Sequence, residues 1–187
     1  DEILVTVGAQ QALYMLAQLL LDKESTIGLE TPGYVDICNI AKLNPSNVRP
    51  IPVDESGMLV GERLKGCDLV YTTPSHQCPT TATMPIERRY QLLEQASKDD
   101  FIIIEDDYES ETNFESNPIP ALKSLDNHDR VLYIGSLSKT LAPGLRLGYL
   151  VGPAKLIQEV RALRRLIVRH PAANNQRSVA LFIERGY

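Results

Sequence analysis

Residues 131–151 read VLYIGSLSKTLAPGLRLGYLV, two apolar runs joined by a short polar connection. The runs at residues 131–135 and 147–151 are rich in aliphatic and aromatic side chains, which predicts two β-strands. The connection is too short for the helical crossover that joins parallel neighbours, and Pro143-Gly144 indicates a turn. The second strand is therefore expected to run antiparallel to its neighbours.

Similar runs precede this stretch, and most are continuously apolar rather than alternating: residues 3–7, 26–30, 48–53, 68–72 and 101–105. Continuous apolar runs are typical of strands that are covered on both faces, as in a parallel sheet. Apolar stripes at helical spacing occur at residues 9–21, 85–98 and 153–169. The pattern predicts an α/β fold, with a mixed, mostly parallel, seven-stranded sheet flanked by helices.

The composition is that of an ordinary globular protein, with 187 residues, 43% apolar and 23% charged. A net charge of −5 disfavours a nucleic-acid surface on this chain itself. Cys38, Cys67 and Cys78 form no C-x-x-C pair, so zinc and a disulfide framework are not expected. This cysteine usage fits a reducing cytoplasm. No apolar run is long enough for a bilayer and the start is not that of a signal peptide, so no membrane contact is expected. The absence of an initiator Met indicates an internal piece of a longer protein.

The residues best suited to bind a ligand follow the predicted strands directly. In an open α/β sheet, ligands bind beyond the carboxyl ends of the strands. The candidates combine a helix start, two aromatic rings, a carboxylate, hydroxyls, a lysine and an arginine. In chain order they are Gly8, Ala9, Gln10, Tyr34, Asp106, Tyr108, Ser136, Ser138, Lys139 and Arg146.

Most of these groups have a structural interpretation beside a chemical one. Gly8 opens a helix whose N–H groups suit a phosphate, or it is only a strand-to-helix turn. Asp106 ends a buried strand and needs a partner, or it caps a helix or loop. Lys139 is a nucleophile where low exposure keeps its amine neutral, or it is a surface lysine. Arg146 clamps an anion bidentately, or it forms a surface salt bridge.

Tyr34 and Tyr108 offer ring faces and hydroxyls, or they simply pack at the edge of the core. A phosphate site, an aromatic face, a carboxylate and an amine are together the contacts that pyridoxal 5'-phosphate needs. The lysine then forms a Schiff base, and the aspartate keeps the pyridine nitrogen protonated so that the ring accepts electrons. Ser136 and Lys139 also match the S-x-x-K motif of serine acylases, but the companion S-D-N and K-T-G motifs are missing.

The run from Ser136-Leu137-Ser138-Lys139 to Gly148-Tyr149 resembles the S-x-S-K…G-x-R-x-G-Y signature of fold-type I, class I/II aminotransferase-like proteins, which use pyridoxal phosphate. The resemblance implies that residues 1–187 are the pyridoxal-phosphate-binding large domain of such a protein. Three catalytic residues are implied, Lys139 for the Schiff base, Asp106 for the ring nitrogen and Tyr108 for the phenolic oxygen. Tyr34 would stack on the ring. The phosphate would be held by Ser136 and Arg146, with Ala9 and Gln10 at the helix start and assistance from Ser138.

Within that superfamily the chain most resembles the MocR-type regulators of the GntR family. The likeness rests on four segments: TPSHQCPT at 73–80 with Met84-Pro85 and Arg88-Arg89, IEDDYESE at 104–111, Arg169-His170-Pro171 and Asn174-Asn175-Gln176. Such regulators join a winged helix-turn-helix to an aminotransferase-like domain. The resemblance therefore implies a homodimer that senses a small amino compound by Schiff-base exchange and that binds DNA through a domain outside this chain.

The chain departs from ordinary aminotransferases in the loop after the fourth predicted strand. Cys78 stands where an Asn usually tunes the phenolic oxygen, and Thr81 stands where Gly is usual. This favours a sensor over an efficient enzyme. His76 either substitutes for the missing Asn or only packs within the loop. Two alternatives stay open, a free-standing aminotransferase and a cofactor-free scaffold domain. The arginines of residues 153–169 suit a solvated face or domain contact better than a DNA-binding stripe.

Overall fold

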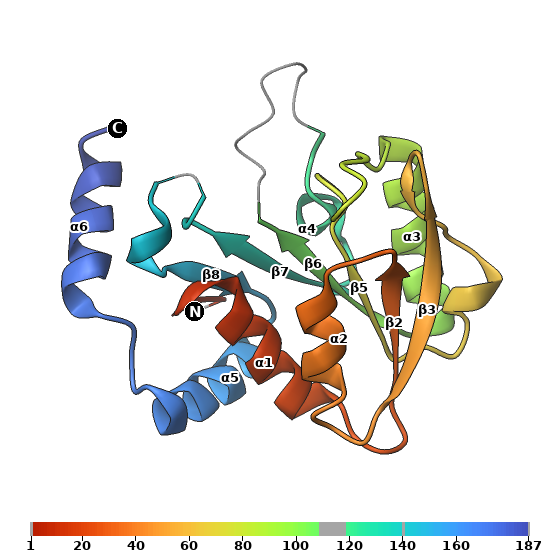
Figure 1. Ribbon diagram of the computed structural model, residues 1–187, viewed down its shortest axis with the longest axis horizontal. Helices are drawn as coiled ribbons and strands as arrows, with labels where there is room; N and C mark the ends of the chain where they lie inside the picture. Colours follow the sequence, from red (N-terminus) through yellow and green to blue (C-terminus); the bar gives the residue numbers. More distant parts are fainter. Residues whose placement is uncertain (1, 109–118, 140, 187) are drawn as a thin grey trace.

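The computed structural model describes residues 2–108, 119–139 and 141–186, which form one mixed sheet with helices on both faces (Figure 1). The strand order is β1-β8-β7-β6-β5-β2-β3-β4. Strands β2, β3, β5, β6 and β7 run parallel, whereas β8 is antiparallel to both β7 and β1. The strand bounds are β1 Ile3–Thr6, β2 Thr26–Thr31, β3 Asn47–Asp54, β4 Gly57–Met58, β5 Leu69–Thr72, β6 Ile102–Asp107, β7 Val131–Ser136 and β8 Gly148–Val151.

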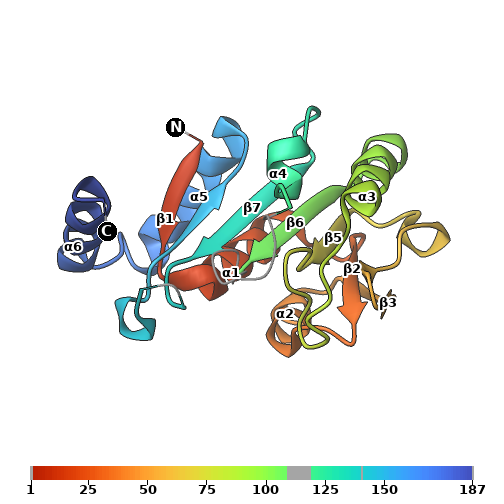
Figure 2. The ribbon, with the colours of Figure 1, turned by 90° about the horizontal axis from the view of Figure 1, so that it is seen from above.

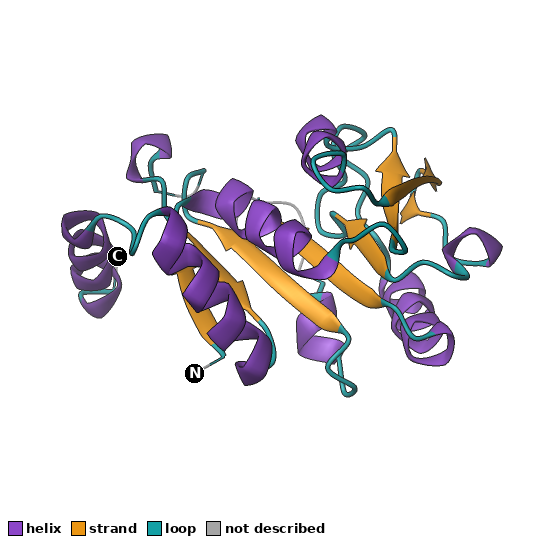
Figure 3. Cartoon of the chain, turned by 90° about the horizontal axis from the view of Figure 1, so that it is seen from below, coloured by secondary structure: helices purple, strands orange, loops and turns teal. Residues whose placement is uncertain are grey.

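Two layers of helices cover the sheet (Figures 2 and 3). One core joins the sheet to α1, α2 and α5, and the second core lies on the other face with α3 and α4. Helix α6 stands at the side of the molecule, beyond α5 (Figure 2). Among the described residues, no helix has both the length and the apolar character to cross a membrane. The helix bounds are α1 Gly8–Leu20, α2 Val35–Ala41, α3 Ile86–Asp99, α4 Leu122–Leu125, α5 Ala154–Ile167 and α6 Ala173–Glu184, with 3-10 turns at Glu62–Leu64 and Pro143–Leu145.

The alternation of side chains along β6 determines what each face of the sheet receives. Ile104 packs into the core of α1, whereas Ile103 packs into the core of α3. Because side chains alternate between faces, Asp106 lies on the α1 face and Asp107 on the α3 face. The carboxyl end of one strand therefore sends two successive carboxylates in opposite directions.

The predicted α/β fold is confirmed, including all seven predicted strands and the antiparallel last strand. The sheet has one strand more than predicted, because β4 adds a two-residue antiparallel pair to the edge strand β3. Strand β6 also continues to Asp107, two residues past its expected end, since Asp106 and Asp107 still pair with β7. Helices were predicted where α1, α3 and α5 lie. Helices α2, α4 and α6 were not predicted individually.

Candidate functional site

A cavity of about 300 Å³ opens at the carboxyl ends of the parallel strands. It is bounded by α1, the end of β6, the loop after β5 and the connection from β7 to β8. All nine residues predicted to bind the cofactor line this cavity: Ala9, Gln10, Tyr34, Asp106, Tyr108, Ser136, Ser138, Lys139 and Arg146. Three further residues complete the lining: Leu13, Tyr71 and Cys78. The roles assigned to the nine residues stay predictions, but their convergence is a fact of the fold.

The start of α1 and Arg146 form the anion-attracting side of the cavity. Gly8 has φ +72°, and a Cβ there would lie 3.0 Å from Nη2 of Arg146. A Cβ on Gly148 would lie 2.7 Å from the carbonyl carbon of Gly8, so β8 can approach the helix start only because it lacks a side chain there. Val7, the N-cap residue of α1, makes no side-chain cap hydrogen bond, and its own N–H donates to Gln11 Oε1 at 2.8 Å. The positive end of the helix and a guanidinium therefore meet at one point, which suits a phosphate.

Asp106 lies on the α1 face of the sheet, and only 4% of its surface is exposed. Tyr71 Oη donates a hydrogen bond of 2.8 Å to Asp106 Oδ2, while Oδ1 has no hydrogen-bond partner among the described residues. Burial raises the pKa of Asp106 to about 7, and the hydrogen bond from Tyr71 acts in the opposite direction. The prediction that this carboxylate is buried and partnered is confirmed. Its second oxygen is a buried acceptor whose hydrogen-bonding capacity is not used by the described residues.

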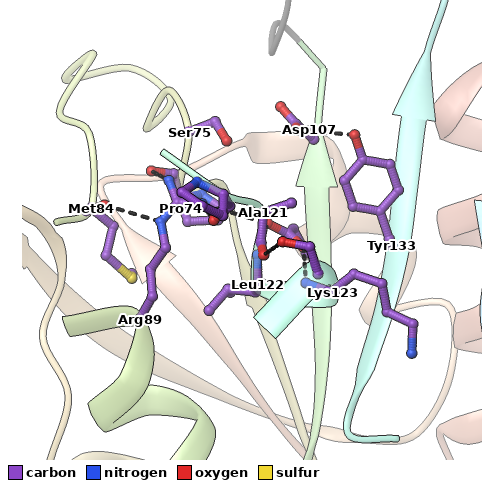
Figure 4. A network of polar contacts seen from close by, with 12 residues as sticks. Pro74, Ser75, Met84, Arg89, Asp107, Ala121, Leu122, Lys123 and Tyr133 are labelled. Atoms are coloured by element: carbon purple, nitrogen blue, oxygen red, sulfur yellow. Dashed lines mark hydrogen bonds and ion pairs between the residues drawn. The ribbon is translucent and has the colours of Figure 1, made fainter. Parts of the chain in front are cut away.

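A second polar cluster lies on the opposite face of β6 (Figure 4). Tyr133 Oη donates to Asp107 Oδ2 at 3.0 Å. The Glu105 carboxylate accepts the backbone N–H groups of Leu122 and Lys123 at 2.8 and 2.9 Å, which anchors the start of α4. Burial raises the pKa of Glu105 to about 7 despite those two bonds. This cluster contributes no side chain to the cavity and serves the packing behind it.

Arg89 ties the loop after β5 to the body of the protein (Figure 4). Its side chain is fully buried and donates to the carbonyls of Pro74, Met84 and Pro120 at 3.0, 3.1 and 2.9 Å. Its Nη1 also lies 3.9 Å from Oε1 of Glu105. One guanidinium thus holds both ends of the loop that borders the cavity. Sequence reasoning used Arg89 only as part of a family motif.

Glu30 holds the same loop from the β2 side. Its carboxylate accepts hydrogen bonds from Thr72 Oγ1 at 2.7 Å, from Thr73 Oγ1 at 2.8 Å and from Gln77 Nε2 at 3.1 Å. Burial raises the pKa of Glu30, whereas these hydrogen bonds lower it. The Thr73 hydroxyl oxygen also accepts the N–H of Cys78 at 3.2 Å, which places Cys78 at the cavity wall.

Tyr108 and Lys139 meet at the edge of the cavity. Tyr108 Oη donates to the carbonyl of His76 at 2.8 Å, and Lys139 Nζ lies 4.5 Å from the centre of the Tyr108 ring. Lys139 is an exposed residue, as the surface-lysine interpretation of the sequence expected, and not one of low exposure. Beside it, Ser138 Oγ is buried without a hydrogen-bond partner among the described residues.

Tyr34 is the N-cap residue of α2, lines the cavity and contacts Gln10 at the start of α1. Its hydroxyl lies 2.9 Å from Gln10 Oε1 and 3.0 Å from Asp36 Oδ2. Burial and the neighbouring carboxylate raise the pKa of Tyr34 to about 12. The hydroxyl is therefore a fixed donor, and ring stacking by Tyr34 stays a prediction.

The profile of the family described as aminotransferase class I and II matches residues 1–181. The chain belongs to this family. Its fold agrees with the aminotransferase-like resemblance of the sequence.

The last three residues of the IEDDYESE motif at 104–111 lie outside the described residues.

Relatives of two kinds match this aminotransferase-family chain. The HTH-type transcriptional regulator TauR of Rhodobacter capsulatus is 46% identical and covers 100% of the chain and 39% of its own length. The probable rhizopine catabolism regulatory protein MocR of Rhizobium meliloti is 35% identical, with 100% and 38% covered. The crystal structure of Pyrococcus horikoshii kynurenine aminotransferase, in complex with PMP, has a TM-score of 0.93 and 32% identity over 99% of this chain and 48% of that one. The chain therefore spans less than half the length of these relatives.

The two departures from the aminotransferase pattern have clear places in the structure. Cys78 lines the cavity, so the position of the usual Asn is occupied by a thiol side chain. Thr81 has φ +65°, a left-handed conformation that favours glycine and is unusual for a β-branched residue. The turn around Thr81 is held by its N–H, which donates to the Gln77 carbonyl at 2.7 Å. The loop thus keeps a glycine-type backbone without the glycine.

Proposed function

We propose that this chain is the pyridoxal-phosphate-binding effector domain of a MocR-type transcription regulator that senses a small amino compound. The observation that carries the proposal is the convergence of the nine predicted residues on one cavity. The similarity to TauR and MocR over the whole chain supports the regulatory part. Residues 1–187 would then be the cofactor-binding large domain, and the DNA-binding domain would belong to the remainder of a longer protein.

The residues of the cavity fit pyridoxal phosphate in charge and in unsatisfied groups. The start of α1 and Arg146 suit the phosphate, with Ser136 alongside. The Ser138 hydroxyl, which has no hydrogen-bond partner among the described residues, suits it too. Asp106 Oδ1 is a buried acceptor without a partner among the described residues, as a protonated ring nitrogen requires. The Lys139 amine would hold the aldehyde. When bound, the cofactor supplies an aldehyde that exchanges amines and a cationic ring that accepts electrons.

The protein groups around Lys139 suggest how a ligand would be sensed. An amino compound would compete with the Lys139 amine for the aldehyde of the cofactor. In the chain without cofactor, Lys139 Nζ lies 4.5 Å from the centre of the Tyr108 ring, where that ring can hold a cation. The Tyr108 hydroxyl donates a hydrogen bond to the carbonyl of His76, which lies in the loop after β5. A movement of Lys139 would therefore reach that loop through Tyr108. A ligand shifts a domain arrangement only by binding one arrangement better than the other. A homodimer in the cytoplasm is the setting in which we propose that this happens.

A second candidate function is that of a free-standing aminotransferase. It is favoured by the likeness to kynurenine aminotransferase, whose structure contains PMP. Cys78 argues against efficient turnover, because a thiol replaces the amide that commonly tunes the phenolic oxygen. If the cofactor were not bound at all, a scaffold role would be left.

One experiment separates these functions. The protein in its full natural length is loaded with pyridoxal phosphate and mixed with a panel of amino acids, diamines and ω-amino acids. For the regulator we expect DNA binding whose affinity changes when an amino compound is added. The cofactor absorption should change until one equivalent of amino compound per cofactor has reacted, and then stop. Many turnovers of a 2-oxo acid without any DNA binding would establish the aminotransferase instead.

A further inference from the structure

Two tyrosines make equivalent contacts on the two faces of the sheet. Tyr71 on β5 pairs in register with Ile104, and its hydroxyl reaches Asp106, two residues further along β6. Tyr133 on β7 pairs with Glu105, and its hydroxyl reaches Asp107, again two residues further along. The hydrogen bonds measure 2.8 and 3.0 Å. Each tyrosine thus serves one of two successive carboxylates.

The two pairs differ in where they face. Tyr71 and Asp106 both line the cavity, and Tyr71 is 1% exposed. Tyr133 and Asp107 lie on the α3 face and line no part of the cavity. The Tyr71 hydroxyl binds Oδ2 of Asp106, whereas Oδ1 is buried and has no hydrogen-bond partner among the described residues. The hydroxyl therefore fixes one carboxylate oxygen and leaves the hydrogen-bonding capacity of the other unused.

We propose that Tyr71 is a positioning residue for cofactor binding, whose hydroxyl orients Asp106 and keeps its carboxylate ionised for a cationic ring nitrogen. This inference rests on the proposed function. Hydrogen bonding to the charged form of an acid favours that form, and the effect is large where water is excluded. Without the hydroxyl, Asp106 would be protonated at a higher pH and would then offer the ring nitrogen a neutral group.

Several charged or titratable groups surround Asp106, and two of them, Asp107 and Glu30, oppose its ionisation. Burial and the negative charges of Asp107 and Glu30 raise its pKa, and the hydrogen bond from Tyr71 is the main opposing influence. The other groups facing this cavity are Tyr34 from α2, Tyr108 from the end of β6, Cys78 from the loop after β5, and Lys139 and Arg146 from the connection of β7 to β8. All of these stay in place when the Tyr71 hydroxyl alone is removed.

The test compares Tyr71→Phe with Tyr133→Phe in the full-length protein. Each change deletes one hydroxyl from one of the two equivalent contacts, and thermal unfolding checks that both variants fold. The first readout is the titration of Asp106 in cofactor-free protein, followed by ¹³C NMR of labelled aspartate and assigned with Asp106→Asn. The second readout is the pH dependence of pyridoxal phosphate binding, followed by cofactor absorption.

We expect Tyr71→Phe to raise the pKa of Asp106 by about one unit, since a hydrogen bond to a charged group is removed. The acid limb of cofactor binding should move up with it, so that affinity on that limb falls about tenfold. Tyr133→Phe should do neither. 3-Fluorotyrosine at position 71, a stronger donor, should lower the pKa and keeps the test available if Tyr71→Phe does not fold.

Two results would overturn the inference. One is an unchanged Asp106 titration in Tyr71→Phe, and the other is an equal change in both variants, which would indicate a general packing effect. Failure of the proposed function looks different, because the wild-type protein would then bind no pyridoxal phosphate. In that case the titration of Asp106 still decides whether Tyr71 controls this carboxylate.

Discussion

Replacement of Asp106 by Asn should stabilise the cofactor-free protein while removing its affinity for the cofactor. Asp106 is 4% exposed, and burial raises its pKa from the ordinary 3.8 to about 7. The folded chain therefore binds the proton more tightly than the unfolded chain does. The contribution of this group to stability is complete below about pH 4 and is lost as the pH rises through 7. Asn carries no charge at any of these pH values and can still accept the Tyr71 hydrogen bond.

The magnitude follows from the rise in the Asp106 pKa, which is about three pH units. At about 1.4 kcal/mol for each unit, wild-type Asp106 costs up to about 4 kcal/mol above pH 7. Between pH 5 and pH 8 the advantage of Asp106→Asn should grow by about 3 kcal/mol. Urea unfolding of the cofactor-free, full-length protein at both pH values measures this difference. Pyridoxal phosphate should raise the unfolding temperature of the wild type and not that of the variant.

The reasoning would be refuted by an advantage of Asp106→Asn that is the same at pH 5 and pH 8. It would also be refuted if the unfolding free energy of Asp106→Asn relative to wild type were lower at pH 8 than at pH 5. Asp68→Asn is the matched control, because Asp68 is an exposed carboxylate that accepts the Thr26 N–H at 2.8 Å on the same sheet.

Three further predictions concern the packing around the cavity. Arg89→Gln should cost about 3 to 5 kcal/mol in urea unfolding, because a buried cation with three carbonyl partners is lost. The neighbouring Arg88→Gln, which loses a partly exposed pair with Asp54, should cost only about 1 kcal/mol; equal costs would contradict the assignment. Thr81→Gly should raise the unfolding temperature by relieving about 1 kcal/mol of left-handed strain, and a lower value would argue against strain. Gly148→Ala should weaken pyridoxal phosphate binding more than pyridoxal binding, because the new Cβ displaces the start of α1; equal losses would show that the helix start is not the phosphate site.

The strands could be predicted because buried parallel strands have continuous apolar sequences, such as FIII at residues 101–104. Helices α1, α3 and α5 have clear apolar stripes at helical spacing. The short helices α2 and α4 do not, since Val35–Ala41 and Leu122–Leu125 are too short for a periodic signal. The two-residue β4 depends on its pairing with β3, which no local sequence pattern predicts.

The candidate site was predictable to the extent that its residues follow strand ends or match a signature. Lys139 and Arg146 are examples, because both lie in one short connection. Tyr71 was missed since it lies inside an apolar strand, where a tyrosine indicates packing; its register relative to Asp106 was the available signal. Arg89 was not recognised as a buried anchor because its partners are carbonyls, which carry no residue identity.

The measurement that tests the central claim most directly is chemical capture of the cofactor. The full-length protein is incubated with pyridoxal phosphate, reduced with borohydride and digested, and the adduct is located by peptide mass spectrometry. We predict one pyridoxyl group, on Lys139, which is lost in Lys139→Ala and retained in Lys155→Ala, a change on α5. An adduct spread over several surface lysines, or none at all, would contradict the claim that this cavity is a pyridoxal phosphate site.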